Sequence, residues 1–137
     1  MGVVIEARNY SPNKELFRLF IFCNSAMAQS IAFSMNKALA AELVKLKPTR
    51  RTMQLENCFV RLLEGLPDQP VIKDIDIMFN PEYKVDVMKI LVSAYKRKPF
   101  SLIWPGGCSG GKLTYSEEGF PDFKSFEIDD YDIMCVI

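Results

Sequence analysis

The sequence predicts an α/β fold with a partly parallel sheet in three layers, and three observations lead to this prediction. Apolar, strand-like runs alternate with amphipathic helical patterns along the chain. The strand-like runs are nearly continuous in hydrophobicity, which is typical of strands buried on both faces. The 137 residues are 49% apolar and 25% charged, so a core can form without a disulfide or metal. We therefore expect one domain over residues 1–137.

The first part of the chain contains an arm, a strand and a helix. Residues 1–13 are expected to form an N-terminal arm, and Leu16–Cys23 (LFRLFIFC) a strand, because this run is apolar and aromatic. Residues 25–47 predict one helix that ends at Pro48, because apolar residues recur at every fourth position. The alternative is that Ile31–Met35 is a short strand and that only the following run, KALAAELVKLK, is helical.

The middle of the chain predicts two further helices around the best strand. Met53–Leu63 has a helical pattern that is closed by a glycine and a proline. Val71–Phe79 (VIKDIDIMF) is the strongest strand candidate. Asn80-Pro81 is expected to open a third helix, whose apolar stripe extends to Tyr95.

The last part of the chain predicts strands. Phe100–Trp104 (FSLIW) and Lys112–Tyr115 (KLTY) are expected to be hairpin partners, joined by the Gly-rich loop Gly106–Lys112. An acidic stretch follows, and the run IMCVI predicts a final strand.

Composition removes several classes of function. Seventeen basic and seventeen acidic residues cancel, so we expect no direct contact with nucleic acid and none with a membrane. The chain has no histidine, which excludes a Ser-His-Asp or Cys-His nucleophile and any imidazole–zinc site within it. Its four cysteines form no CxxC pair, so reduced thiols and a cytoplasmic location are expected.

Two segments invite comparison with a phosphate loop. Gly106–Lys112 (GGCSGGK) matches the first seven positions of GxxxxGK[ST], but Leu113 replaces the Mg²⁺-binding hydroxyl and no helical pattern follows, so a hairpin loop is favoured. Cys23–Ser30 (CNSAMAQS) follows the first strand, where α/β proteins place such a loop. There Gln29 and Ser30 occupy the Lys and Ser positions, and only the hydroxyl is kept.

Asp74 and Asp76 are candidate Mg²⁺ ligands, because acidic residues at strand ends hold magnesium in phosphoryl-transfer sites. The alternative is a solvated strand end. Basic residues form two clusters at predicted helix ends, where cations are stabilised by the negative end of the helix dipole. The alternative is that these clusters contact a polyanion. The residues to test are Arg50, Arg51, Lys96, Arg97 and Lys98.

Four segments in the C-terminal half carry a family resemblance. They occur in the order IDIMFNP, IWPG, KLTY and GFPDF, and together they span residues 75–123. In this order they resemble the small P-loop-containing proteins of BREX bacteriophage-defence systems, the BrxF family. The resemblance implies a P-loop NTPase-like fold, an accessory role in antiphage defence and an ATP site in the N-terminal half.

The chain departs from that family where ATP would bind. The family's lysine-bearing loop would fall at Cys23–Ser30, where Gln29 replaces the lysine, and Lys73 takes the position of the magnesium aspartate. Because of these departures, we expect only a vestigial nucleotide site without metal ligands, formed by Gln29, Ser30, Asp74 and Asp76. We expect a non-enzymatic interaction subunit of a defence complex that needs no cofactor and binds MgATP with a dissociation constant at or above about 1 mM. The alternative is an active small ATP-binding protein or NTPase that uses Mg²⁺.

Overall fold

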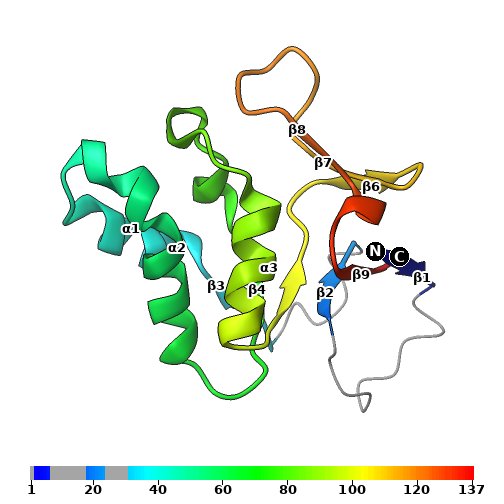
Figure 1. Ribbon diagram of the computed structural model, residues 1–137, viewed down its shortest axis with the longest axis horizontal. Helices are drawn as coiled ribbons and strands as arrows, with labels where there is room; N and C mark the ends of the chain where they lie inside the picture. The colour runs from blue at the N-terminus through cyan, green and yellow to red at the C-terminus, as the bar shows by residue number, and fades with distance from the viewer. Residues whose placement is uncertain (1, 7–17, 24–30) are drawn as a thin grey trace.

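A six-stranded sheet forms the centre of the computed structural model, which describes residues 2–6, 18–23 and 31–137 (Figure 1). In spatial order its strands are β1 (Val3–Ile5), β9 (Ile133–Val136), β2 (Leu19–Phe22), β5 (Ser101–Ile103), β4 (Val71–Lys73) and β3 (Phe33–Ser34). All five neighbouring pairs are parallel. The α/β prediction is confirmed at this level, and the three strands expected to share one sheet, β2, β4 and β5, do share it. The segment expected as an N-terminal arm contributes the edge strand β1.

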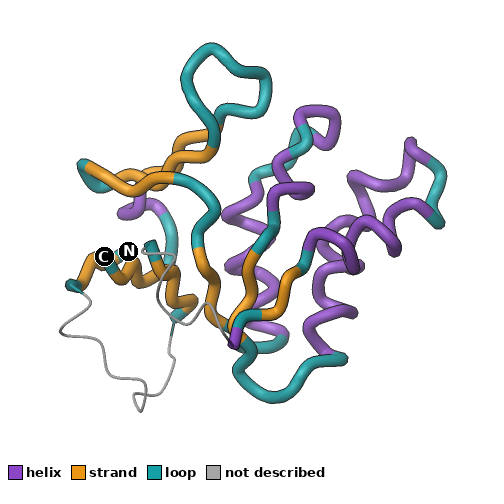
Figure 2. The backbone as a smooth tube through the Cα atoms, turned by 180° about the vertical axis from the view of Figure 1, so that it is seen from behind, coloured by secondary structure: helices purple, strands orange, loops and turns teal. Residues whose placement is uncertain are grey.

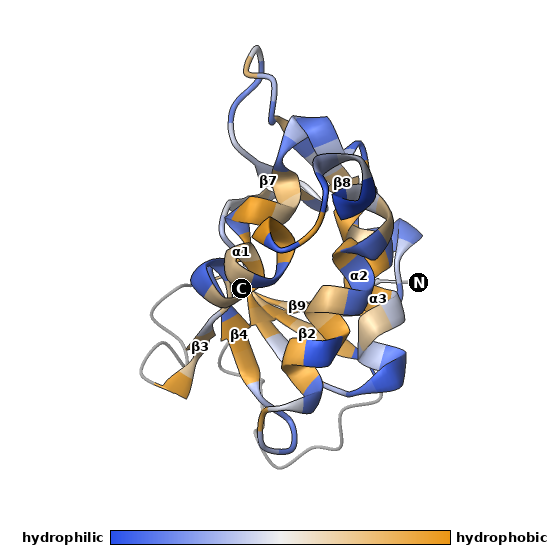
Figure 3. Ribbon diagram, turned by 90° about the vertical axis from the view of Figure 1, so that its left-hand side faces the viewer, coloured by the Kyte–Doolittle hydropathy of each residue, from blue (hydrophilic) through white to orange (hydrophobic). Residues whose placement is uncertain are grey.

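The helices pack on one face of this sheet. They are α1 (Asn36–Val44), α2 (Pro48–Glu64) and α3 (Val87–Arg97). Side chains alternate along a strand, so Leu19 and Ile21 of β2 join the helices in the main core, whereas Phe22 lies in a second, smaller cluster with Ile103 and Val136. Figure 3 shows the apolar strands beside the helices, whose outer faces are hydrophilic.

A small antiparallel sheet follows β5 and lies beside the parallel sheet (Figure 2). Its strands are β6 (Gly107–Ser109), β7 (Lys112–Tyr115) and β8 (Lys124–Glu127), and the 3₁₀ helix η5 (Ile128–Asp130) leads on to β9. Aromatic rings join the two sheets. Phe79 stacks on Tyr115 with 3.9 Å between ring centroids, and meets Trp104 and Phe126 edge to face.

The single helix predicted over 25–47 is wrong over residues 31–35, and the alternative holds there. Phe33 and Ser34 form β3, which pairs with the edge of β4, and α1 begins only at Asn36. Ile31 is 72% exposed, whereas Met35 is fully buried, so the apolar stripe of the helix starts later than the sequence spacing predicts. Residues 24–30 lie outside the described part. Pro48 does not end this helix but begins α2, at the first helical position that proline tolerates.

The strand predicted over Val71–Phe79 ends at Lys73. Asp74 adopts a left-handed backbone with φ +55°, which breaks the extended conformation. A 3₁₀ helix, η3 (Asp76–Phe79), follows. Met78 and Phe79 are adjacent and both buried. A short helical turn permits this, whereas in a strand with one exposed face one of two adjacent side chains would be exposed.

The third helix begins six residues later than predicted. Asn80 caps only the short 3₁₀ turn η4 (Pro81–Tyr83), which stops at Lys84 with φ +50°. Asp86 then accepts a hydrogen bond from the Lys89 amide at 3.1 Å and caps α3. The predicted cap, Asn80, therefore starts only a short turn, and Asp86 starts the long helix.

The Gly-rich segment Gly106–Lys112 is a hairpin, as expected, but its strands differ from the prediction. Lys112–Tyr115 pairs with Gly107–Ser109 inside the predicted loop, and β5 pairs with β2 and β4 instead. The turn itself is Gly110-Gly111, with φ +58° and +76°. Two successive positive φ values define the tight turn that matches strand twist in hairpins.

Candidate functional site

A cleft of about 260 Å³ lies at the carboxyl ends of β2, β5 and β4. Its lining is formed by the residues that end these strands or follow them: Cys23, Lys73, Asp74, Ile103, Trp104, Pro105 and Gly106. β3, the next strand in sequence after β2, lies on one side of β2 in the sheet, whereas β9, the next strand of this sheet after β5, lies on the other side, so that the order reverses at β2. Ligands of open α/β sheets bind where connections diverge in this way. The cleft is therefore the candidate functional site.

The segment that joins β5 to the small sheet, Trp104–Gly106, forms one side of the cleft. The indole Nε1 of Trp104 donates a hydrogen bond to the carbonyl of Thr114 at 2.9 Å. A Cβ at Gly106 would lie 1.9 Å from the same oxygen, so only glycine allows this close approach. The WPG segment thus fixes the β6–β7 hairpin against the end of β5.

Asp74, a predicted site residue, lines the cleft and is held by β3. The Ser34 hydroxyl donates a hydrogen bond of 2.5 Å to its carboxylate. Aspartate tolerates the left-handed backbone found here better than most residues. This carboxylate keeps one oxygen for a further partner.

Asp76, the second predicted carboxylate, turns away to the aromatic cluster. Burial raises its pKa, and the negative charge of nearby Asp74 raises that pKa further. A hydrogen bond with the Tyr115 side chain acts in the opposite direction. Burial and the charge of Asp76 raise the pKa of Tyr115 to about 12. The structure thus brings the two carboxylates near each other, but only Asp74 lines the cleft.

Lys73 brings a positive charge to the same cleft. It is the last residue of β4 and is half-buried. Its backbone carbonyl accepts a hydrogen bond from the Met35 amide. Among the residues that the structure describes, no carboxylate lies within ion-pair distance of its ammonium group. The cleft therefore presents one ammonium and one carboxylate from adjacent positions of a single chain segment.

Each phosphate-loop candidate contributes its first residue, Cys23 or Gly106, to the lining of the cleft. Gln29 and Ser30 lie outside the described residues. Lys112 starts a strand instead of a helix, and its ammonium group pairs with Glu127 at 3.4 Å. Gly106–Lys112 therefore lacks the helix N-terminus that a phosphate loop requires.

Two of the five basic residues proposed for polyanion contact instead donate hydrogen bonds to backbone carbonyls at helix ends. Arg51 Nε donates to the carbonyl of Leu43, in the last turn of α1, and to that of Leu46, just after this helix. Lys98 Nζ donates to the carbonyl of Leu63, in the last turn of α2, at 2.7 Å, and to that of Leu66, just after this helix. These cations complete the ends of helices, as the helix dipole favours. Arg50, Lys96 and Arg97 are exposed.

Three thiols from distant parts of the sequence gather beside the cleft. Cys23 forms side-chain hydrogen bonds with Cys135 and Cys108. The bond to Cys135, together with burial, raises the pKa of Cys23 far above its ordinary value, and burial raises that of Cys108 to about 12. All four cysteines of the chain are free. The raised pKa values keep Cys23 and Cys108 protonated at neutral pH, which suppresses thiolate chemistry at these two residues.

Sequence reasoning missed the contacts that shape this site. Ser34 meets Asp74 across 40 positions, and Tyr115 meets Asp76 across a similar interval. No local motif links residues so far apart, so only the strand order could have revealed these contacts.

Comparisons with models of known protein families, with curated proteins and with solved structures found no match to this chain. Within the described ranges, no helix combines the length and the apolar character needed to cross a bilayer.

Proposed function

We propose that this chain is an accessory interaction subunit of a bacterial antiphage-defence complex, with a degenerate P-loop NTPase-like fold and little or no nucleotide hydrolysis. The resemblance of residues 75–123 to the BREX proteins supports the biological setting. The parallel sheet and the cleft at its carboxyl ends support the comparison with nucleotide-binding α/β folds.

The proposed fold has three layers. Helices α1–α3 supply one outer layer. Phe22, Ile103 and Val136 are buried on the opposite face of the sheet, which supports a cover on that face too, since parallel sheets are buried on both sides.

One observation carries the proposed loss of nucleotide hydrolysis: Lys73 and the engaged carboxylate of Asp74 both line the cleft at the carboxyl ends of the strands. Lys73 ends β4, and Asp74 beside it is held by Ser34. A cation next to the magnesium position opposes the binding of a divalent ion, because like charges repel at short range. Gln29 in the sequence adds to this effect, since a neutral amide lacks the charge that pairs with the terminal phosphates.

Titration calorimetry of the full chain with MgATP tests the proposed degenerate site. We expect a dissociation constant at or above about 1 mM. Asp74→Asn is the matched variant, because asparagine tolerates the left-handed backbone and still accepts from Ser34. Micromolar affinity that Asp74→Asn abolishes would contradict the proposal and establish the ATP-binding alternative.

Phage challenge of the native host tests the proposed setting separately. Deleting the gene is expected to raise the efficiency of plaque formation at least about tenfold, a clear loss of defence, and both the wild-type chain and Asp74→Asn should restore protection. Unchanged plaque counts after deletion would refute the role in defence. Restoration by the wild-type chain alone would refute the non-enzymatic role.

A further inference from the structure

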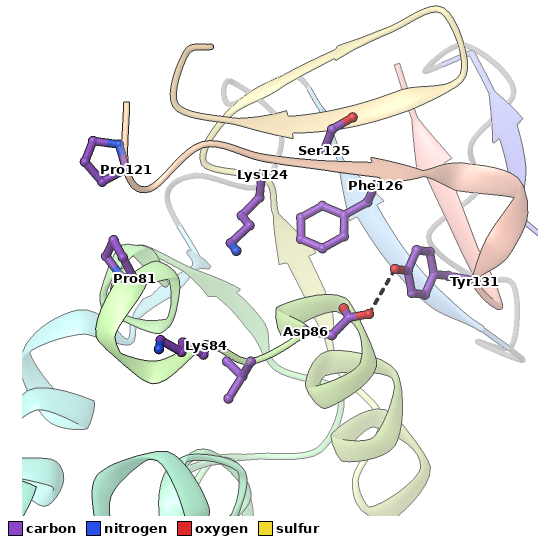
Figure 4. Close-up of a pocket in the computed structure, with 9 residues that line it drawn as sticks. Pro81, Lys84, Asp86, Pro121, Lys124, Ser125, Phe126 and Tyr131 are labelled. Carbon is purple, nitrogen blue, oxygen red and sulfur yellow. Dashed lines mark hydrogen bonds between the residues drawn. The ribbon is translucent and has the colours of Figure 1, made fainter. Parts of the chain in front are cut away.

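A second cleft, of about 490 Å³, opens between the start of α3 and strand β8 (Figure 4). Apolar groups of Pro81, Val85 and Phe126 form part of its lining. Lys84 and Lys124 come from its two opposite sides, and the Lys124 side chain extends from β8 into the gap between them. The cleft thus combines apolar surface with two ammonium groups.

The two lysines outnumber the one carboxylate of the cleft. In the described part of the chain, neither forms an ion pair. The carboxylate in the cleft belongs to Asp86, and it is already engaged: one oxygen accepts from the Lys89 amide and the other from the Tyr131 hydroxyl, both at 3.1 Å. The positive charge in the cleft is therefore available to an acidic group from outside.

The loop beside this cleft, residues 116–123, extends away from the body of the protein (Figures 1 and 3). Hydrogen bonds shape it. The Phe120 amide donates to the Glu117 carbonyl at 3.1 Å, and the Ser116 hydroxyl closes the base of the loop on Asp122 at 2.7 Å. Gly119, with φ +95°, permits the turn between them. The loop is thus preorganised.

The side chains that this loop presents complement the cleft. Phe120 is 58% exposed and is the most exposed aromatic side chain among the described residues. Glu117 and Glu118 are exposed, and neither pairs with a cation of the described segments. An aromatic anchor flanked by carboxylates fits an apolar cleft flanked by ammonium groups.

We propose that two copies of this chain associate by exchanging these features, with Phe120 of each copy in the second cleft of the other and Glu117 and Glu118 paired with Lys84 and Lys124. Pro121 of the loop also lines the cleft, so loop and cleft lie side by side on one face. A two-fold axis between two such faces makes both contacts at once, as an isologous dimer requires. The contact is small, so the dimer is weak and reversible.

Sedimentation velocity across a concentration series tests the dimer. At about 50 mM salt, the wild-type chain should dimerise with a constant in the range of about 10–100 µM, and the dimer should weaken as salt rises. Phe120→Ala should weaken it at least tenfold, since aromatic anchors dominate small interfaces. Met53→Ala, at an exposed apolar position on α2 away from the cleft, is the matched control and should leave the constant unchanged.

Charge exchange tests the pairing itself. Lys84→Glu with Lys124→Glu should weaken the dimer, and so should Glu117→Lys with Glu118→Lys. Mixing the two reversed variants should restore association, because both contacts of the mixed dimer again join opposite charges. A wild-type chain that stays monomeric to about 500 µM overturns the proposal, because even weak specific contacts associate there. So does a dimer that Phe120→Ala leaves intact, or a mixture that fails to associate.

Discussion

Lys98→Met should destabilise the protein by removing the ammonium group that closes α2. Lys98 Nζ donates to two carbonyls at the end of this helix, that of Leu63 in its last turn and that of Leu66 just after it. The side chain is half-buried, and methionine keeps most of its apolar stem. The substitution therefore isolates the contribution of the charge.

The expected magnitude follows from what each carbonyl loses. A hydrogen bond from a charged donor contributes about 1.5–3 kcal/mol. The Leu63 carbonyl keeps a second donor, the Leu66 amide at 3.0 Å, so its loss is smaller, whereas Leu66 loses the ammonium outright. We expect a decrease of about 2 kcal/mol in the free energy of unfolding, which corresponds to roughly 6–10 °C in melting temperature for a chain of this size.

Urea denaturation at 25 °C measures this change. Lys96→Met is the matched control, because Lys96 is exposed in the last turn of α3, and it should stay within about 0.5 kcal/mol of the wild-type chain. Equal stabilities for the two variants would refute the capping role of Lys98. Loss of binding to duplex DNA in Lys98→Met, without loss of stability, would instead favour a polyanion contact.

Three further substitutions test other parts of the structure. Phe79→Ala removes the ring at the centre of the aromatic cluster and should cost about 3–5 kcal/mol by urea denaturation, and a cost below 1 kcal/mol would show that the two sheets are joined in another way. Burial raises the pKa of Asp76, so the folded state binds the proton more tightly than the unfolded state. Stability then falls as pH rises from the ordinary value of 3.8 through the raised pKa. Asp76→Asn should accordingly raise the melting temperature at pH 7 and lose this advantage below pH 3.8, whereas an advantage that is independent of pH would contradict this explanation. Gly111→Val places a branched side chain at φ +76° and should cost at least about 1–2 kcal/mol. Gly111→Asn should cost less, since asparagine adopts this conformation more readily, and the reverse order in thermal melts would refute the turn geometry.

Sequence alone predicted the strands best where apolar residues run without interruption. LFIF, SLI and IMCV each form a strand of the parallel sheet, because burial on both faces requires such runs. The run Val71–Phe79 looks the same in sequence but changes conformation at Asp74, where a single backbone angle decides the outcome. Periodicity cannot report such a local change.

Helix boundaries and the candidate site depended on tertiary contacts. Ile31 continues the spacing of Met35 and Leu39, yet β3 forms instead of helix because the edge of β4 offers it a pairing partner. The carboxylates of the site were found by their position after a strand, but their partners Ser34 and Tyr115 are supplied by other segments. Spacing along the chain carries no information about such partners.

The position of β9 has a consequence for how the chain is made. This strand inserts between β1 and β2, and both its neighbours are parallel to it, although more than a hundred residues separate it from either in the sequence. Ribosomes add about 5–20 residues per second, so β2 emerges roughly 6–22 s before the strand that covers its edge. During that interval the apolar run LFIF has an open edge able to bind a chaperone or another nascent chain. We therefore expect the sheet to close after synthesis of β9, and the yield of folded protein to depend on chaperone supply.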